Sequence, residues 1–215
     1  MEKSSQMEVI LHRINTSKQL RKVSKSKGIE VDIRYHENEL ILHHDPLHHH
    51  ENPKPEKFED FLKSWGHNGV MILNLKSEGL EDECIRLMNQ YKAEKWFFLD
   101  MSMPYFAKYA ELAAGNSIEG FGPDNLAVRF SEREAVEYAL KFKGKAGWVW
   151  VDCFTYMPLD KEIYRVLKTN GFKTCLVSPE LQKHDIARIG EFKKILSNHD
   201  ISLDAVCTKH PDLWM

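Results

Sequence analysis

Short apolar runs alternate with helix-like segments along the whole chain, and this rhythm constrains the fold more than any other feature. Eight of the runs have the length and composition of buried strands. They are 9–11, 29–33, 70–75, 96–99, 126–128, 148–151, 172–177 and 203–206. Strands that alternate with helices form parallel sheets, because each helix carries the chain back to the same edge. The sequence therefore predicts an α/β fold, and eight units favour a closed (β/α)₈ TIM barrel.

The segments between the runs carry helix signals. Apolar side chains recur at helical spacing in 58–65 and 80–91, and the polar segment 17–27 is compatible with a helix that Gly28 ends. Ser131 and Glu134 have the spacing of a capping box, which predicts a helix that begins at Ser131. Further helices are expected at 103–114, 161–168 and 186–196.

The barrel is expected to be a short variant that forms a single domain over residues 1–215. No linker divides the chain, and too few residues follow the last run for a full eighth helix. An open, doubly wound sheet is the structural alternative. No Gly-x-Gly-x-x-Gly follows the first run, which argues against the commonest form of that alternative.

Composition narrows the class of protein. Hydrophobic residues make up 42% of the chain, enough for a sizeable core. The formal net charge is −2, which argues against a nucleic-acid partner. No apolar run approaches the ~18 residues that span a bilayer, and the polar N-terminus lacks a signal-peptide core. We expect a soluble, cytoplasmic protein without a transmembrane segment. Its four scattered cysteines are expected to be buried structural thiols.

Ionisable residues stand at the ends of several predicted strands, where barrel enzymes gather their catalytic groups. Glu30 and Asp32 are two residues apart and therefore share one face of a strand, as do Asn74 and Lys76. Such groups are costly inside apolar strands unless they are paired or bind a cation. The other strand-end candidates are His12, Arg13, Arg129 and Asp152.

The order and spacing of these motifs resemble the glycerophosphodiester phosphodiesterase family, in the superfamily of phospholipase-C-like barrels. The family has His-Arg-Gly at strand one, Glu-x-Asp at strand two, His-Asp-Pro soon after and an acidic-x-Lys pair at strand three. Here the corresponding residues are His12-Arg13, Glu30-x-Asp32, His44-Asp45-Pro46 and Asn74-x-Lys76, and Thr208 to Pro211 is similar to the closing segment.

The resemblance implies a role for each residue. His12 and His44 correspond to the general acid and general base, in an order that the sequence leaves open. Glu30 and Asp32, with Asn74 at the third position, correspond to ligands of one divalent cation, Mg²⁺ or Ca²⁺, which prefer oxygen ligands. Arg13 and Lys76 correspond to groups that neutralise the phosphoryl oxygens, and Lys76 also belongs to the catalytic set. Arg129, at the end of the fifth strand, is a further candidate for binding phosphate.

The chain departs from the family pattern at several positions. Ile14 stands where the family has glycine, and Asn74 stands where it has an acidic ligand, which predicts weaker metal binding. Strand seven ends in Ser178-Pro-Glu180, where the family more often shows a Trp-Thr-x-Asn-like run. His43 lies beside His44, and the Asp-Pro spacing selects His44. The run His48–His50 is expected to be a solvated loop.

These observations predict a metal-dependent phosphodiesterase that acts on a small-molecule glycerophosphodiester or a related phosphodiester. Two other functions stay open. A degenerate barrel would bind a phosphorylated ligand or a partner without turnover, as the Asn74 departure suggests. A barrel isomerase or aldolase would use Lys76 as a Schiff-base amine, although neighbouring carboxylates oppose the neutral amine it needs. Trp148 and Trp150 are interpreted as core or as a wall of the site, and Asp152 and Glu180 as residues that shape its mouth.

Overall fold

A computed structural model describes residues 7–47 and 54–215. The polar segment before Met7 and the histidine run His48–His50 lie outside the described residues, so the expectations for both stay predictions. Among the described residues, no helix has the length and apolar character needed to cross a bilayer.

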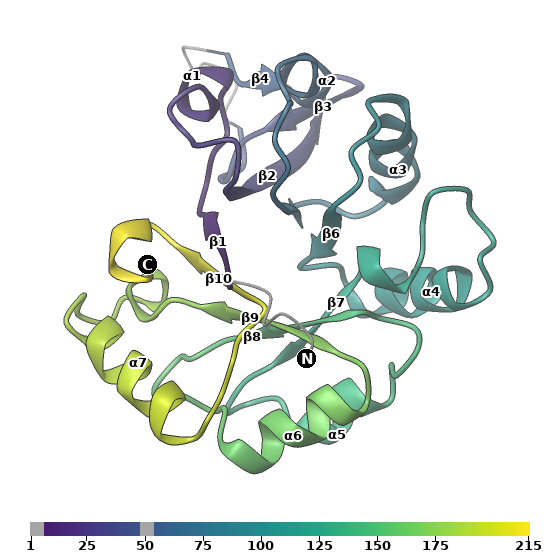
Figure 1. The fold of residues 1–215 in the computed structure, drawn as a ribbon. Helices are drawn as coiled ribbons and strands as arrows, with labels where there is room; N and C mark the ends of the chain where they lie inside the picture. Colours follow the sequence, from purple (N-terminus) through teal and green to yellow (C-terminus); the bar gives the residue numbers. More distant parts are fainter. Residues whose placement is uncertain (1–6, 48–53) are drawn as a thin grey trace.

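Eight parallel strands close into a barrel with helices around its outside (Figure 1). Around the barrel they are β1 (Glu8–Leu11), β2 (Gly28–His36), β5 (Met71–Leu75), β6 (Trp96–Leu99), β7 (Ala127–Phe130), β8 (Trp148–Val151), β9 (Lys173–Val177) and β10 (Ala205–Thr208). Strand β1 pairs with both β2 and β10, and a single bridge from Phe98 to Leu126 joins β6 to β7. The predicted (β/α)₈ barrel is therefore confirmed, and the open doubly wound sheet is excluded.

The helices follow the strands in alternation. They are α1 (Ser17–Leu20), α2 (Phe58–Lys63), α3 (Glu81–Gln90), α4 (Met103–Ala114), α5 (Val136–Leu140), α6 (Lys161–Thr169) and α7 (Arg188–Asn198). The 3₁₀ turn η3 (Pro211–Leu213) follows β10, and the 3₁₀ turns η1 (Pro123–Asn125) and η2 (Pro179–Gln182) lie in earlier connections.

Two predicted helix boundaries are wrong. The helix expected over 17–27 is the single turn α1, because beyond Leu20 the segment is almost entirely exposed and has no apolar stripe to bury. The helix expected to begin at Ser131 is α5, which begins at Val136. The Ser131 hydroxyl donates to the Glu134 carboxylate, and the two backbones pair in a bridge, so the capping-box spacing forms a tight turn instead.

An antiparallel hairpin extends β2 beyond the barrel. Strand β3 (Glu39–Leu42) pairs with the outer half of β2, and β4 (Glu56–Lys57) pairs with β3. Glu37 and Asn38 form the turn, both with positive φ, as a two-residue hairpin of this hand requires. The hairpin returns the chain to the barrel mouth, where the His43 amide donates to the Asp32 carbonyl oxygen over 3.0 Å.

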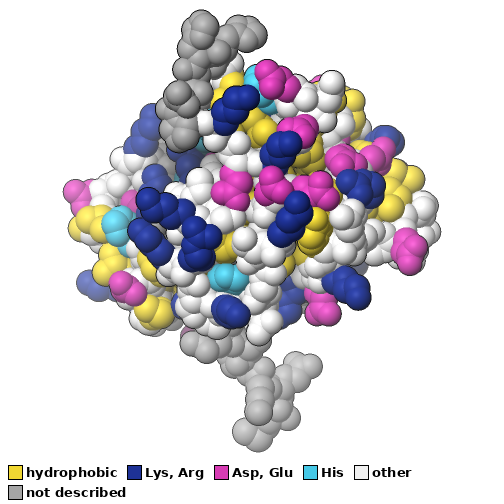
Figure 2. Space-filling view, turned by 90° about the horizontal axis from the view of Figure 1, so that it is seen from above, with side chains coloured by type: hydrophobic (Ala, Val, Ile, Leu, Met, Phe, Trp, Pro, Cys, Tyr) yellow, Lys and Arg dark blue, Asp and Glu magenta, His cyan; other side chains and the backbone are white. Residues whose placement is uncertain are grey.

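The core has an inner and an outer layer. Inside the barrel, Ile10, Ile72 and Phe97 pack with Trp148 and Trp150, so the two tryptophans are core residues. The outer layer lies between the strands and the helices. All four cysteines are free and buried, as expected for structural thiols. Outside the core, Figure 2 shows a face where acidic side chains lie between groups of Lys and Arg, so neither charge dominates that face.

The close approach of β5 to the start of β2 gives a test of the barrel. A Cβ atom on Gly69 would lie 2.4 Å from the backbone carbonyl of Lys27, whereas one on Gly66 would meet nothing within 4 Å. Gly69→Ala should therefore lower the free energy of unfolding by about 1–3 kcal/mol relative to Gly66→Ala. Urea unfolding of both variants measures the difference, and equal stability would contradict the strand packing.

Candidate active site

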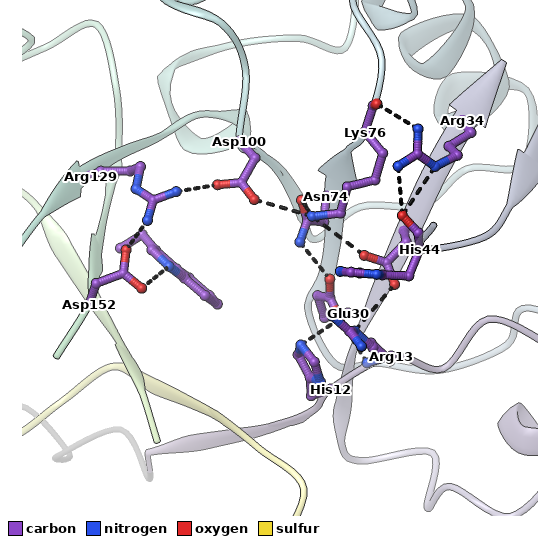
Figure 3. Close-up of polar contacts among 12 residues, drawn as sticks. His12, Arg13, Glu30, Arg34, His44, Asn74, Lys76, Asp100, Arg129 and Asp152 are labelled. Carbon is purple, nitrogen blue, oxygen red and sulfur yellow. Dashed lines mark hydrogen bonds and ion pairs between the residues drawn. The ribbon is translucent and has the colours of Figure 1, made fainter. Parts of the chain in front are cut away.

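The register of neighbouring strands brings the predicted residues to one end of the barrel. Asp32 of β2 lies opposite Asn74 of β5. Lys76 follows the last residue of β5 directly, two positions after Asn74. His12 and Arg13 follow β1 directly. Figure 3 shows His12, Glu30, Asn74 and Lys76 gathered at this end of the barrel. The structure therefore joins most of the residues that the sequence predicted.

Glu30 and Asp32 are completely buried. The Glu30 carboxylate accepts hydrogen bonds from the Arg13 amide over 2.7 Å and from Asn74 Nδ2 over 2.9 Å. Burial, and then the charge of Asp32, raise the pKa of Glu30 above its ordinary value. Two acidic groups thus share a buried site, where carrying both negative charges is costly without a nearby cation.

Lys76 supplies part of that positive charge. Its Nζ atom lies 2.7 Å from Asn74 Oδ1, 3.3 Å from Asp100 Oδ2 and 3.6 Å from Asp32 Oδ1. Schiff-base chemistry needs an amine that is free to attack a carbonyl carbon, whereas Lys76 Nζ is engaged by three oxygen atoms. The contacts therefore favour a role in binding an anion over the isomerase or aldolase alternative.

His12 stands over the carboxylate pair, with Nε2 3.7 Å from Glu30 Oε2. Burial lowers the pKa of His12 to about 3, and the nearby cations Arg13 and Lys209 lower it further in the same direction. The imidazole is therefore neutral at neutral pH and is able to accept a proton.

His44 lies where the hairpin rejoins the barrel mouth and is more exposed than His12. Its Nδ1 atom is 2.8 Å from Asp45 Oδ1, and this hydrogen bond is the main cause of a lowered pKa at Asp45. His43 turns to the loop instead, with Nδ1 2.7 Å from the Asp45 carbonyl oxygen.

Arg13 has a left-handed backbone, with φ of 58°. This conformation is unfavourable for residues other than glycine. It directs the Arg13 amide to the Glu30 carboxylate, and the Ile14 amide donates to the Glu30 carbonyl oxygen. Ile14 itself is buried. The turn that follows His-Arg is thus formed without the glycine of the family pattern. The Arg13 side chain is partly exposed, with Nε 3.8 Å from Asp32 Oδ2.

Sequence reasoning missed two residues that hold the site together. Asn15 Nδ2 donates to Asp32 Oδ2 over 2.8 Å, and Asn15 Oδ1 accepts from the Asp32 amide over the same distance. Arg34 donates from Nη2 to the His44 carbonyl oxygen over 2.7 Å and from Nη1 to the Lys76 carbonyl oxygen over 3.0 Å. Arg34 follows Asp32 by two residues on β2, and this shared face was the available signal.

A second charged group lies across the mouth. Arg129 Nη1 is 2.5 Å from Asp100 Oδ1, Arg129 Nη2 bonds Asp152, and Arg129 Nε is 3.7 Å from Glu134 Oε1. Burial raises the pKa of Asp152 to about 6. Three carboxylates therefore surround Arg129, and a phosphate bound there would compete with them for the guanidinium group. Its phosphate-binding role stays a prediction.

A cleft of about 130 Å³ lies at this end of the barrel. Its polar wall is formed by His12, Glu30, Asn74, Asp100, Arg129, Asp152 and Gln182, with Trp150 among its apolar lining. Trp150 Nε1 and Gln182 Nε2 both donate to Asp152 Oδ1, so Asp152 shapes the mouth as expected. Glu180 accepts from Thr208 Oγ1 and the Lys209 amide, and it fixes the loop after β10.

The donor set fits a hard divalent cation. Asp32 Oδ1 is buried and receives no hydrogen bond from any described residue. It stands beside the Glu30 carboxylate and the Asn74 amide, a set of oxygens that Mg²⁺ and Ca²⁺ prefer. Across residues 7–47 and 54–215, no three His, Cys, Asp or Glu side chains are grouped for a metal. A cation here would therefore rely on the amide oxygen of Asn74 or on other oxygens.

Comparison with solved structures reveals the same fold. A glycerophosphoryl diester phosphodiesterase from Parabacteroides distasonis superposes with a TM-score of 0.67 at 12% identity, over 99% of this chain and 86% of that chain. A glycerophosphodiester phosphodiesterase from Agrobacterium tumefaciens gives 0.66 at 13% identity, over 97% and 99%. No protein-family model matches the chain, and no curated protein does. The predicted resemblance is confirmed at the level of the fold, which is that of these TIM barrels.

The Arg34 contacts lead to a prediction about the hairpin. Arg34→Met removes the charged donor that joins the His44 and Lys76 carbonyl oxygens. Hydrogen bonds from charged groups contribute about 1.5–3 kcal/mol, so we expect a loss of stability in that range and faster amide exchange in residues 39–47. Arg165→Met, at an exposed position on α6, is the control. Unchanged exchange in the hairpin would show that Arg34 does not hold the loop.

Proposed function

We propose that this protein is a metal-dependent phosphodiesterase that hydrolyses a glycerophosphodiester or a related phosphodiester. The observation that carries the proposal is the buried Glu30–Asp32 pair, with Lys76 Nζ 3.6 Å from Asp32 and His12 Nε2 3.7 Å from Glu30 at one end of the barrel. The barrel shared with two solved structures described as phosphodiesterases supports it. The proposal assigns this chain to the phosphoric diester hydrolases.

Glu30, Asp32 and Asn74 would hold one divalent cation, Mg²⁺ or Ca²⁺. Such a cation offsets negative charge on a phosphoryl group as that charge grows in the transition state. The protein supplies further positive charge at the same place. Lys76 and Arg13 each lie within 4 Å of an Asp32 oxygen, so both stand at the metal side of the cleft. We assign them to binding the phosphoryl oxygens.

His12 is proposed as the general base. Its imidazole is neutral because the site is buried and rich in cations, so it takes a proton from the attacking hydroxyl and does not carry one at rest. The low pKa of His12 limits the strength of this base. It also means that a protonated His12 would transfer its proton onward readily.

His44 is proposed as the general acid. Asp45 Oδ1 lies 2.8 Å from His44 Nδ1 and orients the ring, and His44 would give a proton from Nε2 to the leaving alcohol. Arg34 positions the loop that carries His44 relative to Lys76. The pair of imidazoles thus divides the acid and base roles by environment, one dry and near cations and the other beside a carboxylate.

A degenerate barrel that binds a phosphorylated ligand without turnover is the second candidate. Asn74 favours it, because the amide replaces a charged ligand and its oxygen already accepts from Lys76. The two candidate functions differ in whether they require the His12–His44 acid–base pair. A binding site has no need of His12 and His44, so substitutions there separate the candidates.

His12→Ala tests turnover. We expect hydrolysis of bis-(p-nitrophenyl) phosphate in the presence of Mg²⁺ or Ca²⁺, and a loss of about 10²–10⁴-fold in kcat for His12→Ala. His36→Ala, on the hairpin away from the cleft, should keep wild-type kcat. Melting temperatures check that all proteins are folded. A near-normal rate for His12→Ala would contradict the proposed base, and metal-dependent binding without any hydrolysis would favour the degenerate barrel.

Asn74→Asp tests the cation site. A third carboxylate should tighten binding of Mg²⁺ or Ca²⁺ several-fold in calorimetric titration, whereas Asp32→Asn should weaken it at least as much. Asp212→Asn, at an exposed position after β10, is the control for general charge effects. Equal affinity in wild type, Asn74→Asp and Asp32→Asn would place the cation elsewhere.

A further inference from the structure

The barrel is least continuous between β6 and β7. Every other pair of neighbouring barrel strands is joined by a ladder of two or more register pairs, whereas β6 and β7 share the single bridge from Phe98 to Leu126. Beyond this bridge, no register pair joins β6 to β7 among the described residues, so the hydrogen-bonded wall is interrupted between them. Asp100 and Arg129, near the carboxyl ends of these two strands, line the cleft.

An apolar pocket of about 200 Å³ opens at this interruption, and we call it the seam pocket. Its apolar walls include Met101, Met103, Phe106, Val128 and Tyr138, contributed by the β6–α4 connection, α4, β7 and α5. Phe106 is buried and packs edge-on against Phe142, which makes the floor rigid. The pocket is large enough for a short alkyl chain or a ring.

The rim of the seam pocket exposes large apolar groups. Met103 is 50% exposed and Tyr138 is 39% exposed, and the Tyr138 hydroxyl lies 2.9 Å from Met103 Sδ across the opening. Tyr138 packs edge-on against the buried Phe142 and, with Met103, lines the seam pocket. Exposed apolar side chains around a concave site commonly mark a place where a ligand is bound.

The seam pocket adjoins the proposed active site, and the Asp100–Arg129 ion pair lies between them. Asp100 and Arg129 line both the seam pocket and the polar cleft that contains His12 and Glu30. Asp100 also bonds Lys76, the residue assigned to the phosphoryl group. A ligand with its phosphate at Lys76 would reach the apolar space by extending past the Asp100–Arg129 pair.

We propose that the seam pocket binds the apolar chain of one alcohol of the phosphodiester substrate. This inference rests on the proposed function and narrows its substrate class. The preferred diester would carry an alkyl or acyl chain on one side of the phosphate, and small polar diesters such as those with two glycerol groups would be weaker ligands. Removing apolar surface from water supplies the added affinity.

Binding of alkyl phosphates tests the inference without requiring turnover. Methyl, butyl and hexyl phosphate are titrated calorimetrically into the protein with Mg²⁺ present. We expect affinity to rise about fourfold for each added methylene until the pocket is filled, from the value of a buried CH₂ group. Met103→Gln and Tyr138→Ser should each reduce the gain from methyl to hexyl by at least threefold. Affinity for methyl phosphate should stay unchanged in both.

Tyr35→Ser is the matched control, because Tyr35 is a similarly exposed tyrosine on the hairpin. An affinity independent of chain length would overturn the inference, as would equal losses in Tyr138→Ser and Tyr35→Ser.

Failure of the proposed function has a different signature. Chain-dependent binding with no hydrolysis of any diester would retain the seam pocket and reject the phosphodiesterase. Hydrolysis with kcat/KM independent of chain length would retain the enzyme and reject the seam pocket.

Discussion

The burial of two neighbouring carboxylates, Glu30 and Asp32, is the constraint on which the rest of the site depends. Neither side chain reaches solvent, and an isolated charge in such a place would cost several kcal/mol. The surrounding structure reduces that cost with Asn15, the Arg13 amide, Asn74 and Lys76, each at a strand end or in the turn after β1. One oxygen of Asp32 still receives no hydrogen bond from the described residues. A barrel that only needed stability would have apolar residues here, so the arrangement indicates a site built to receive positive charge and an anion.

The polar residues at the strand ends could be predicted from the sequence, because their grouping depends on local rules. Residues two apart share a face, and parallel strands bring their ends together, so Glu30, Asp32 and Lys76 were predictable as a group. Contacts that depend on loop geometry were not predictable. Arg34 bonds two backbone carbonyls whose positions are set by the β2–β3 hairpin, and no side-chain pattern marks a carbonyl acceptor. The Ser131–Glu134 spacing was misread for the same reason: a turn and a capping box use the same two residue types at the same separation.

The two halves of the mouth have different characters. On the β1–β2–β5 side, polar groups converge on the carboxylate pair. On the β6–β7 side, the single bridge between the strands leaves room for apolar side chains, and Asp100 with Arg129 divides the two regions. Asp100 contacts both Lys76 and Arg129, so it links the polar cleft to the wall of the apolar pocket. Under the proposed function, the phosphate and the attached alcohol would be recognised by neighbouring parts of the mouth.

Phosphorus NMR of a glycerophosphodiester incubated with the protein tests the central claim most directly. With Mg²⁺ or Ca²⁺, the diester resonance should decline and be replaced by that of a phosphomonoester or a cyclic phosphate, and EDTA should stop the change. The spectrum identifies the bond that is broken as well as the activity. A diester signal that persists with either metal, while the folded protein binds the cation and a phosphorylated ligand, would contradict the account and leave a barrel that binds without turnover.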